Sequence, residues 1–225
     1  MNESQDTRLA LIAAARALFA EHGYDGTSIK AITTRARANL GAVTYHFGTK
    51  EDLYHAVLRS VGEPFLARLK AAACESGGPL DRIEALVRAF FNHLSDNGEM
   101  PSLMLHELSL NRPIPSPLQE IMGQVFKTVA GVIQSGQRDG SIIDGNPKLL
   151  VVSVLALPAY VMWMRIPLHD VAGLDTHDRP AGGGRGRILE HIVTSIRRSL
   201  DSGASARAGT GSRSRISKRK AGKAK

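Results

Sequence analysis

Residues 26–50 constrain the fold of this chain more than any other stretch, because they predict two short helices separated by a tight turn. Ile29 and Ile32 recur at helical spacing behind a Thr-Ser pair that can cap a helix. Asn39 can cap a second short helix that runs to Phe47. Two short helices joined by a turn of three or four residues form a helix-turn-helix, whose second helix suits the DNA major groove.

The charge of this stretch distinguishes it from the rest of the chain. It contains four basic residues and no acidic residue. The formal net charge of the protein is +8, but eight of its 29 basic residues follow Asp201, and the other 21 balance the 21 acidic residues. The overall excess therefore belongs to the C-terminal end, whereas the local excess at residues 26–50 favours a contact with nucleic acid.

The remaining sequence shows helical periodicity and no strand alternation of useful length, which predicts an all-α fold. Thr7–His22 is expected to form the first helix and to end at Gly23. A long helix is expected from Lys50 to about Ala73, with a kink or break at Pro64, because proline removes one helical hydrogen bond. Further helices are expected over residues 79–95, 102–110, 116–139, 147–166 and 187–200, with a loop over residues 167–186.

These elements divide the chain into three parts. Residues 1–50 are expected to form a three-helix DNA-binding domain that contains the helix-turn-helix. Residues 51–201 are expected to form a larger helical domain for regulation and dimerisation. Residues 202–225 are rich in Gly, Ala, Ser, Lys and Arg, so we expect a disordered basic tail that either binds phosphates or only aids solubility.

The sequence also favours a cytoplasmic protein without a membrane span. Cys74 is the only cysteine, which excludes an intrachain disulfide and suits a reducing compartment. The polar N-terminus lacks the apolar segment of a signal peptide. The sixteen uncharged residues 149–164 fall short of the ~20 that a spanning helix needs, so they predict a buried helix.

The order of a helix, a helix led by Thr-Ser, a turn, and a second helix ending in the pattern YHF-x-x-K-E-x-L resembles the tetracycline-repressor (TetR) family of bacterial transcription regulators. The resemblance covers about residues 8–58. The matching residues are Phe19, Gly23, Tyr24, Thr27, Ser28, Ile29, Ile32, Ala36, Asn39, Gly41, Tyr45, His46, Phe47, Lys50 and Leu53. Phosphate-binding loops, catalytic triad motifs and metal-ligand spacings are not recognised, so neither an enzyme, a cofactor nor a metal site is expected.

The resemblance implies three groups of DNA-contacting residues. The first group, Thr27 and Ser28, holds a phosphate at a helix N-terminus. The second group faces base edges and consists of Leu40, Gly41, Ala42 and Thr44. The third group contacts the DNA backbone and consists of Tyr45, His46 and Lys50.

Two positions depart from the family pattern. Arg37 stands where the family usually has glycine, in a turn that favours a left-handed backbone, so Arg37 either tolerates strain or reshapes the turn. Arg37 could in return reach a phosphate. Asn39 stands where serine is common and is expected to cap the second helix equally well.

The resemblance further implies a homodimer that binds a double-stranded operator and responds to a small effector. The predicted dimer interface consists of the apolar helices at residues 147–166 and 187–200. The candidate ligand residues, which could equally be core, are Phe65, Phe90, Met104, Met122, Phe126, Tyr160, Trp163 and Met164. The predicted function is a repressor that a small, largely apolar ligand releases from DNA. The alternative is a ligand-independent DNA-binding protein whose larger domain only dimerises or docks a protein partner.

Overall fold

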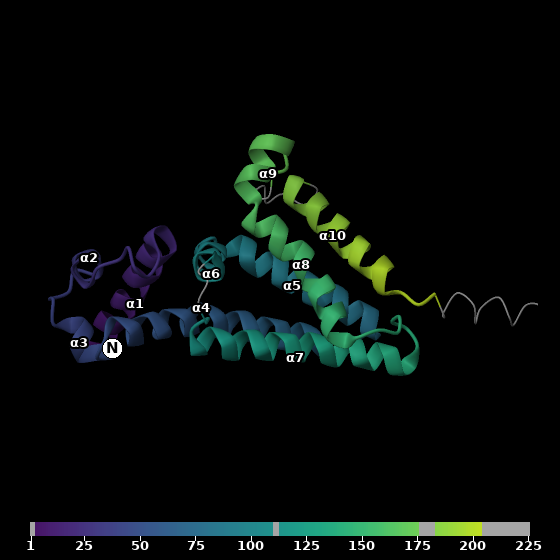
Figure 1. Cartoon of the computed structure of the whole chain (residues 1–225), viewed down its shortest axis with the longest axis horizontal. Coiled ribbons are helices and arrows are strands. Elements are labelled where there is room, and N and C mark those ends of the chain that lie inside the picture. The colour runs from purple at the N-terminus through teal and green to yellow at the C-terminus, as the bar shows by residue number, and fades with distance from the viewer. Residues whose placement is uncertain (1–2, 110–112, 176–182, 204–225) are drawn as a thin grey trace, which may run out of the picture.

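The computed structural model describes residues 3–109, 113–175 and 183–203 and shows a protein built from α-helices (Figure 1). The described residues form ten helices and no β-strand. The helices are α1 (Glu3–His22), α2 (Ile29–Arg35), α3 (Ala42–Phe47), α4 (Lys50–Ala73), α5 (Pro79–Asp96), α6 (Glu99–Ser109), α7 (Ser116–Asp139), α8 (Pro147–Trp163), α9 (Arg165–Ala172) and α10 (Gly184–Leu200). The predicted all-α fold is confirmed.

Helices α1 to α3 and the first half of α4 share one apolar core. Phe19 of α1, Ile32 of α2 and Val43 of α3 have no exposed surface. The ring of Tyr54 on α4 packs edge-on against Phe19, with the ring centroids 4.9 Å apart. This core continues along α4 to Val61, so the packing of the N-terminal unit extends well into the long helix.

The second half of α4 belongs to a larger bundle with α5, α7, α8 and α10. Helices α4 and α7 lie side by side along the molecule (Figure 1). They approach closely at Gly62, where a Cβ atom would lie 2.4 Å from Cδ1 of Ile121. Glycine permits this approach because it has no side chain. The bundle has a core of its own, which begins at Phe65 and ends at Leu200.

Pro64 does not break α4. The helix runs continuously from Lys50 to Ala73 with Pro64 inside it. The proline is exposed, so its ring points away from the bundle and displaces no packed side chain. The lost hydrogen bond therefore falls on the solvent side, where water can satisfy the freed carbonyl. The expected break is absent.

The structure corrects the prediction of one helix over residues 147–166 and a loop over 167–186. Helix α8 ends at Trp163, and a separate helix, α9, follows after Met164. The two axes are bent by 69°. Pro167 lies in the first turn of α9, where a missing N–H group costs no helical hydrogen bond. The predicted loop thus begins with a helix.

The end of α10 is joined to the loop after α7. The backbone N–H of Ile143 donates to the carbonyl of Leu200 at 2.8 Å, beside an isolated β-bridge between Ile142 and Asp201. Most of the predicted basic tail, from residue 204 on, lies outside the described residues. Among the described helices, no single one has the length and hydropathy of a membrane span. Helices α8 and α9, which are bent relative to each other, have that length and hydropathy only when they are taken together.

Candidate DNA-binding surface and ligand cavity

The turn between α2 and α3 has a regular hydrogen-bonded geometry. Ser28 caps α2 as predicted, since its Oγ accepts from the N–H of Ala31 at 3.1 Å. At the other end, the N–H of Arg37 donates to the carbonyl of Thr34, and the next N–H reaches back to Thr33. This pairing is a Schellman motif, which requires a left-handed residue at the position of Arg37. Arg37 adopts φ +54° and so tolerates the strain instead of reshaping the turn.

Helix α3 presents one face to solvent and buries the other. Leu40, just before the helix, is 64% exposed, and Tyr45 is 80% exposed. Thr44 is also exposed, whereas Val43 is fully buried. Leu40 and Tyr45 therefore leave apolar surface on this side of α3 that a partner can contact. The exposed face is that of the predicted base-reading residues.

Three residues of the predicted DNA surface are placed differently by the structure. The side chain of Thr27 is buried, and its hydroxyl donates to the carbonyls of Leu18 and Gly23, so it fixes the chain after α1 and cannot reach a phosphate. Ala42 is buried against the N-terminal core. Asn39 does not cap α3, because the helix begins only at Ala42 and makes no side-chain cap.

Lys50 and His46 lie at the edge of this surface and are half-buried. The Nζ of Lys50 donates to the carbonyl of Tyr24 at 2.7 Å and lies 4.2 Å from the centre of the Tyr24 ring. Lys50 thus ties the start of α4 to the end of α1, and only its remaining donors are available for a phosphate. The ring of His46 packs edge-on against Tyr45 at 4.9 Å.

Arg8 is a basic residue of this region that the sequence motif does not identify. Its guanidinium lies 5.1 Å from the centre of the Phe47 ring, at the C-terminal end of α3. Arg8 is exposed, so its charge adds to that of the exposed Lys30 and Arg37 on the same unit. Local spacing could not reveal this neighbour, because Arg8 and Phe47 meet only when α1 packs on α3.

An apolar cavity of about 220 Å³ lies in the larger domain between α4, α5, α6, α7 and α8. Six of the eight predicted ligand residues line it: Phe65, Phe90, Met104, Met122, Phe126 and Trp163. Tyr160 and Met164 do not line it. Tyr160 lies on the exposed face of α8, and Met164 lies at the break between α8 and α9. Residues that were not predicted include Leu58, Val61, Leu94, Met100, Leu108, Ile121, Val125 and Leu155.

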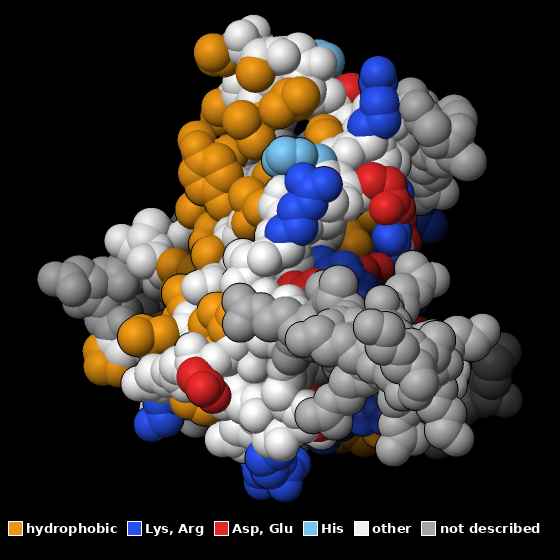
Figure 2. Space-filling view, turned by 90° about the vertical axis from the view of Figure 1, so that its right-hand side faces the viewer, with side chains coloured by type: hydrophobic (Ala, Val, Ile, Leu, Met, Phe, Trp, Pro, Cys, Tyr) orange, Lys and Arg blue, Asp and Glu red, His pale blue; other side chains and the backbone are white. Residues whose placement is uncertain are grey.

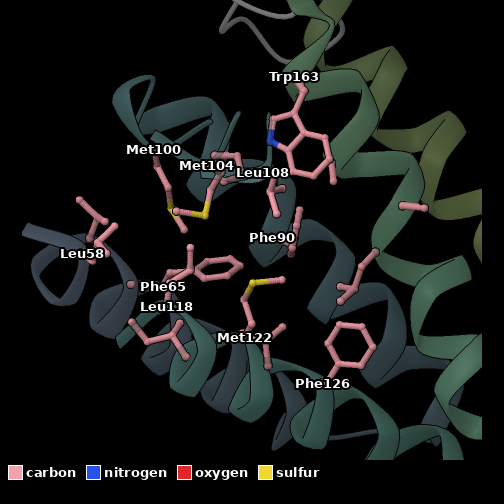
Figure 3. A pocket seen from close by; sticks show the side chains of 18 of the residues that line it. Leu58, Phe65, Phe90, Met100, Met104, Leu108, Leu118, Met122, Phe126 and Trp163 are labelled. Carbon is pink, nitrogen blue, oxygen red and sulfur yellow. The ribbon is translucent and has the colours of Figure 1, made fainter. Parts of the chain in front are cut away.

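Among the residues that the structure describes, the cavity wall contains no ionisable side chain. Its aromatic members come from different helices, and Phe65 meets Phe90 edge-to-face at 5.3 Å. Trp163 closes one side of the cavity, opposite Met122 and Phe126, with its ring nitrogen on the side of Met104 (Figure 3). Such a wall can bury apolar ligand surface and offers little to a charged group.

His93 of α5 lies behind this wall and is 4% exposed. Its ring packs on Phe65, with the centroids 5.1 Å apart. Burial lowers the pKa of His93, the charge of Arg68 lowers it further, and Asp96 opposes the shift. No described residue accepts from or donates to its Nδ1 atom. The imidazole is therefore held in its neutral form.

Helix α6 connects the cavity with the N-terminal unit. One side of α6 lines the cavity through Met100, Met104 and Leu108. On another side, the carboxylate of Glu107 is buried and accepts a hydrogen bond from the hydroxyl of Tyr54 at 2.5 Å. Tyr54 is itself part of the N-terminal aromatic core.

Two further contacts join α6 to α1. Glu99 Oε2 lies 2.6 Å from Nε of Arg16. The ring of His106 packs on the backbone of Gly23, where an added Cβ atom would lie 3.3 Å from its Nδ1. Helix α6 is thus held by a cluster of polar contacts at the unit that carries α3.

The outer face of α8 carries a band of exposed apolar side chains, which continues onto α9. Leu149, Val152 and Tyr160 are exposed along α8, and Ile166 and Val171 are exposed on α9. Figure 2 shows apolar side chains gathered in a band along this edge of the molecule. A continuous band of this kind marks an interaction surface.

Helix α10 was predicted to contribute uncovered apolar surface to the same interface. The structure shows instead that its apolar surface is covered. The apolar residues of α10 are all packed in the core of their own subunit, among them Leu189, Ile192 and Ile196. Its outer face is polar and is partly engaged, since Glu190 forms a two-bond ion pair with Arg88 of α5. The unmatched apolar surface lies on α8 and α9.

A family profile described as "Bacterial regulatory proteins, tetR family" matches residues 11–57. The HTH-type transcriptional regulator RutR of Escherichia coli K12 is 29% identical over 133 residues, which cover 57% of this chain and 62% of RutR. The HTH-type transcriptional repressor Rv3405c of Mycobacterium tuberculosis H37Rv is 40% identical over 80 residues, which cover 36% of this chain and 40% of that repressor.

The alignments therefore span less than two thirds of these relatives. The similarity of the fold extends further than that of the sequence. The crystal structure of the transcriptional regulator FadR from Bacillus subtilis, in complex with stearoyl-CoA, has a TM-score of 0.71 with this chain at 15% identity. The match covers 85% of this chain and 98% of FadR. At that identity it shows a common fold for both the N-terminal unit and the larger helical domain.

Proposed function

Because the chain belongs to the tetR family of bacterial regulatory proteins, we propose that it is a dimeric, sequence-specific DNA-binding repressor that a small apolar ligand releases from its operator. The observation that carries this proposal is the two-sided α3: Val43 anchors it in a filled core, while Leu40, Thr44 and Tyr45 project into solvent. A protein of this kind acts in the cytoplasm on chromosomal DNA.

The exposed face of α3 suits the DNA major groove. Gly41 and Thr44 leave room for close approach, and the methyl groups of Leu40 and Thr44 can meet thymine methyl groups. Tyr45 at the end of the face and the Ser28 cap at the start of α2 can reach the phosphates on either side. The exposed cations Lys30 and Arg37 supply electrostatic attraction.

A single α3 offers few base contacts, so a dimer is needed for useful specificity. The band of Leu149, Val152, Tyr160, Ile166 and Val171 is the surface on which a second copy would pack. Two copies related by a two-fold axis would read half-sites about 34–36 Å apart, or a multiple of that spacing. A monomeric mass in solution, measured by light scattering, would contradict this part of the proposal.

Release by a ligand would use helices α4 and α6. Both line the cavity and both enter the N-terminal unit, α4 by its first half and α6 through the Tyr54–Glu107 hydrogen bond. A ligand that packs between Phe65 of α4 and Met104 of α6 changes the relative position of these helices, and with it the spacing of the two copies of α3. The ligand must bind one spacing more tightly than the other.

The alternative is a ligand-independent DNA-binding protein. The cavity favours the ligand-responsive function. Well-packed cores contain few voids larger than a water molecule, whereas this cavity has a volume of about 220 Å³. A protein that only dimerises through α8 has no need of that space.

The DNA-binding proposal is tested by gel shift with the full chain and the DNA that flanks its gene. Tyr45→Ala is expected to weaken binding about tenfold or more, since the exposed phenol of each subunit is removed. The control is Lys127→Ala, which changes an exposed residue of α7 in the larger domain and should bind DNA as the wild type does. Equal binding by both variants would show that α3 does not contact the operator.

A further inference from the structure

We propose that the cavity takes a compact, uncharged ring compound of roughly ten non-hydrogen atoms, oriented by one hydrogen bond from the indole of Trp163. The inference rests on the proposed function in that it makes this cavity the effector site. It goes further in giving the size, charge and polarity of the effector.

The chemistry of the wall sets the charge. No described residue that lines the cavity carries an ionisable side chain, and the three sulfur atoms among these residues come from thioethers. The buried His93 behind Phe65 is held neutral and lies outside the wall, so it supplies no counter-charge. An ion in this space would lose its hydration and gain no partner, which is a large cost. A neutral compound avoids that cost.

The volume of the cavity indicates the size of the ligand. An apolar cavity of about 150 Å³ lined by Leu, Ile and Phe is known to hold benzene. The present cavity, at about 220 Å³, is roughly one and a half times as large. Pockets for drug-sized ligands typically measure about 300–1,000 Å³. The space therefore suits a substituted single ring or a fused pair of rings, and a long acyl chain would have to extend beyond it.

The shape of the wall favours a ring over a flexible chain. Phe65 and Phe90 present an edge-to-face pair, and Trp163 and Phe126 line two further sides of the cavity (Figure 3). Aromatic side chains bind other rings in offset or edge-on contacts, and methionine sulfur also packs favourably on ring edges. Met104 and Met122 stand on either side of the central space.

Trp163 supplies the one directed polar group of the wall. Its ring N–H is the only side-chain donor among the described lining residues, and no described residue accepts a hydrogen bond from it. A ligand with one acceptor, such as a carbonyl or ether oxygen, would pair with this donor. A second polar group on the ligand would remain unpaired and would reduce affinity.

The test uses three probes of nearly equal size and one long-chain probe, dodecanoate, against the full-length protein, with dissociation constants from calorimetry. Acetophenone has a ring and one acceptor, ethylbenzene has no acceptor, and benzoate carries a charge. Acetophenone is expected to bind, ethylbenzene about two- to tenfold more weakly, and benzoate about a hundredfold more weakly or not at all. Trp163 is the only tryptophan of the chain, so a change in its emission places the bound probe at this cavity.

Two variants assign the interaction. Trp163→Phe keeps an aromatic wall without the N–H, so acetophenone should lose its advantage and bind no more tightly than ethylbenzene, with ethylbenzene unchanged from wild type. Val171→Ala, on the exposed face of α9 and outside the wall, should reproduce the wild-type constants. Thermal unfolding of each variant verifies that it is folded.

The outcomes separate the effector class from the proposed function. Benzoate binding as tight as that of acetophenone, or dodecanoate binding tighter than every ring compound, would overturn the inference. So would a failure of all neutral ring probes to bind. DNA binding without any probe is measured separately: if the operator is bound in those cases, only the effector class fails. If no DNA is bound while acetophenone binds as expected, the inference on the cavity stands and the proposed function fails.

Discussion

The N-terminal unit and the larger domain place their functional apolar side chains on opposite sides of their helices. In the N-terminal unit, Leu40 and Tyr45 project into solvent, and the core beneath them is filled by contacts such as that of Phe19 with Tyr54. In the larger domain, Phe90 and Phe126 face inward and line the cavity. In the proposed function, the first unit recognises DNA by its outer shape and the second recognises a ligand by its inner volume.

This difference has a physical consequence for stability. A filled core gains dispersion contacts on every side of each side chain, whereas a side chain on a cavity wall lacks partner atoms on one side. The N-terminal unit should therefore lose more stability for each buried atom removed. The larger domain should give up little stability at its cavity wall, because a ligand is expected to supply the missing contacts there.

The largest effect is expected for a truncation in the filled core. Phe19→Ala should lower the free energy of unfolding by about 3–5 kcal/mol, because Phe19 has no exposed surface and contacts two other rings. Phe126→Ala on the cavity wall should cost only about 1–2 kcal/mol. Urea unfolding followed by circular dichroism measures both. Equal losses would show that the two regions are packed alike.

The next effect concerns the hydrogen bond between the two regions. Tyr54→Phe removes the hydroxyl that donates a hydrogen bond to the buried carboxylate of Glu107 at 2.5 Å. The change should lower the free energy of unfolding by about 1–3 kcal/mol. It should also weaken the release of DNA by acetophenone, because α6 is then held to α4 by one hydrogen bond fewer. Tyr160→Phe on the exposed face of α8 is the matched control and should change neither quantity. Unaltered release by Tyr54→Phe would remove this bond from the coupling.

A smaller effect should appear as a dependence on pH. The pKa of His93 is lowered in the folded protein by burial, so the unfolded chain binds the proton more readily. Stability is then fully present above about pH 6.5 and falls as the pH drops below that value, by at most about 1.4 kcal/mol per pH unit from this group. His93→Gln should show a flatter dependence between pH 7.5 and 5 in the same urea assay. Parallel curves would mean that other groups cause the decline.

The smallest effect is expected at the turn of the helix-turn-helix. Arg37→Gly removes a side chain from a residue at φ +54° and should stabilise the N-terminal unit by up to about 1 kcal/mol. If Arg37 also neutralises a phosphate, the same change makes DNA affinity less dependent on salt. The negative slope of log affinity against log salt becomes shallower by about 0.9 for each phosphate that is no longer neutralised. Arg35→Gly, inside α2, should be destabilising instead. A decrease in the stability of Arg37→Gly would show that the arginine side chain makes interactions that outweigh the strain.

The sequence determined the type and order of most elements. Helical spacing with Gly and Pro at the ends located α5 and α7 closely, and Thr-Ser located the start of α2. It failed where a short-range signal had two meanings. Thr27 and Ser28 are equally good caps in sequence, but only packing against Leu18 decides that Thr27 turns inward. Pro167 reads as a helix breaker, although it equally suits the first turn of α9.

The residues of the DNA-binding face and those of the cavity differ in how well the sequence alone predicts them. The residues of the proposed DNA-binding face lie within one short stretch, so the family resemblance was sufficient to suggest Leu40, Thr44 and Tyr45, which are exposed in the structure. The cavity draws on five helices, and its aromatic and Met residues were found only because they are large and apolar. Aliphatic members such as Val61 and Leu155 carry no signal that separates a cavity wall from a core.

By itself, the sequence determined that the chain is helical and that residues 26–50 form a basic helix-turn-helix. These properties depend on neighbours within a few residues, whose spacing is visible in the chain. Only the tertiary structure decided that α10 buries its apolar face while α8 exposes one, and that the larger domain leaves an empty volume. Those properties depend on how much surface distant helices cover, which no local spacing records.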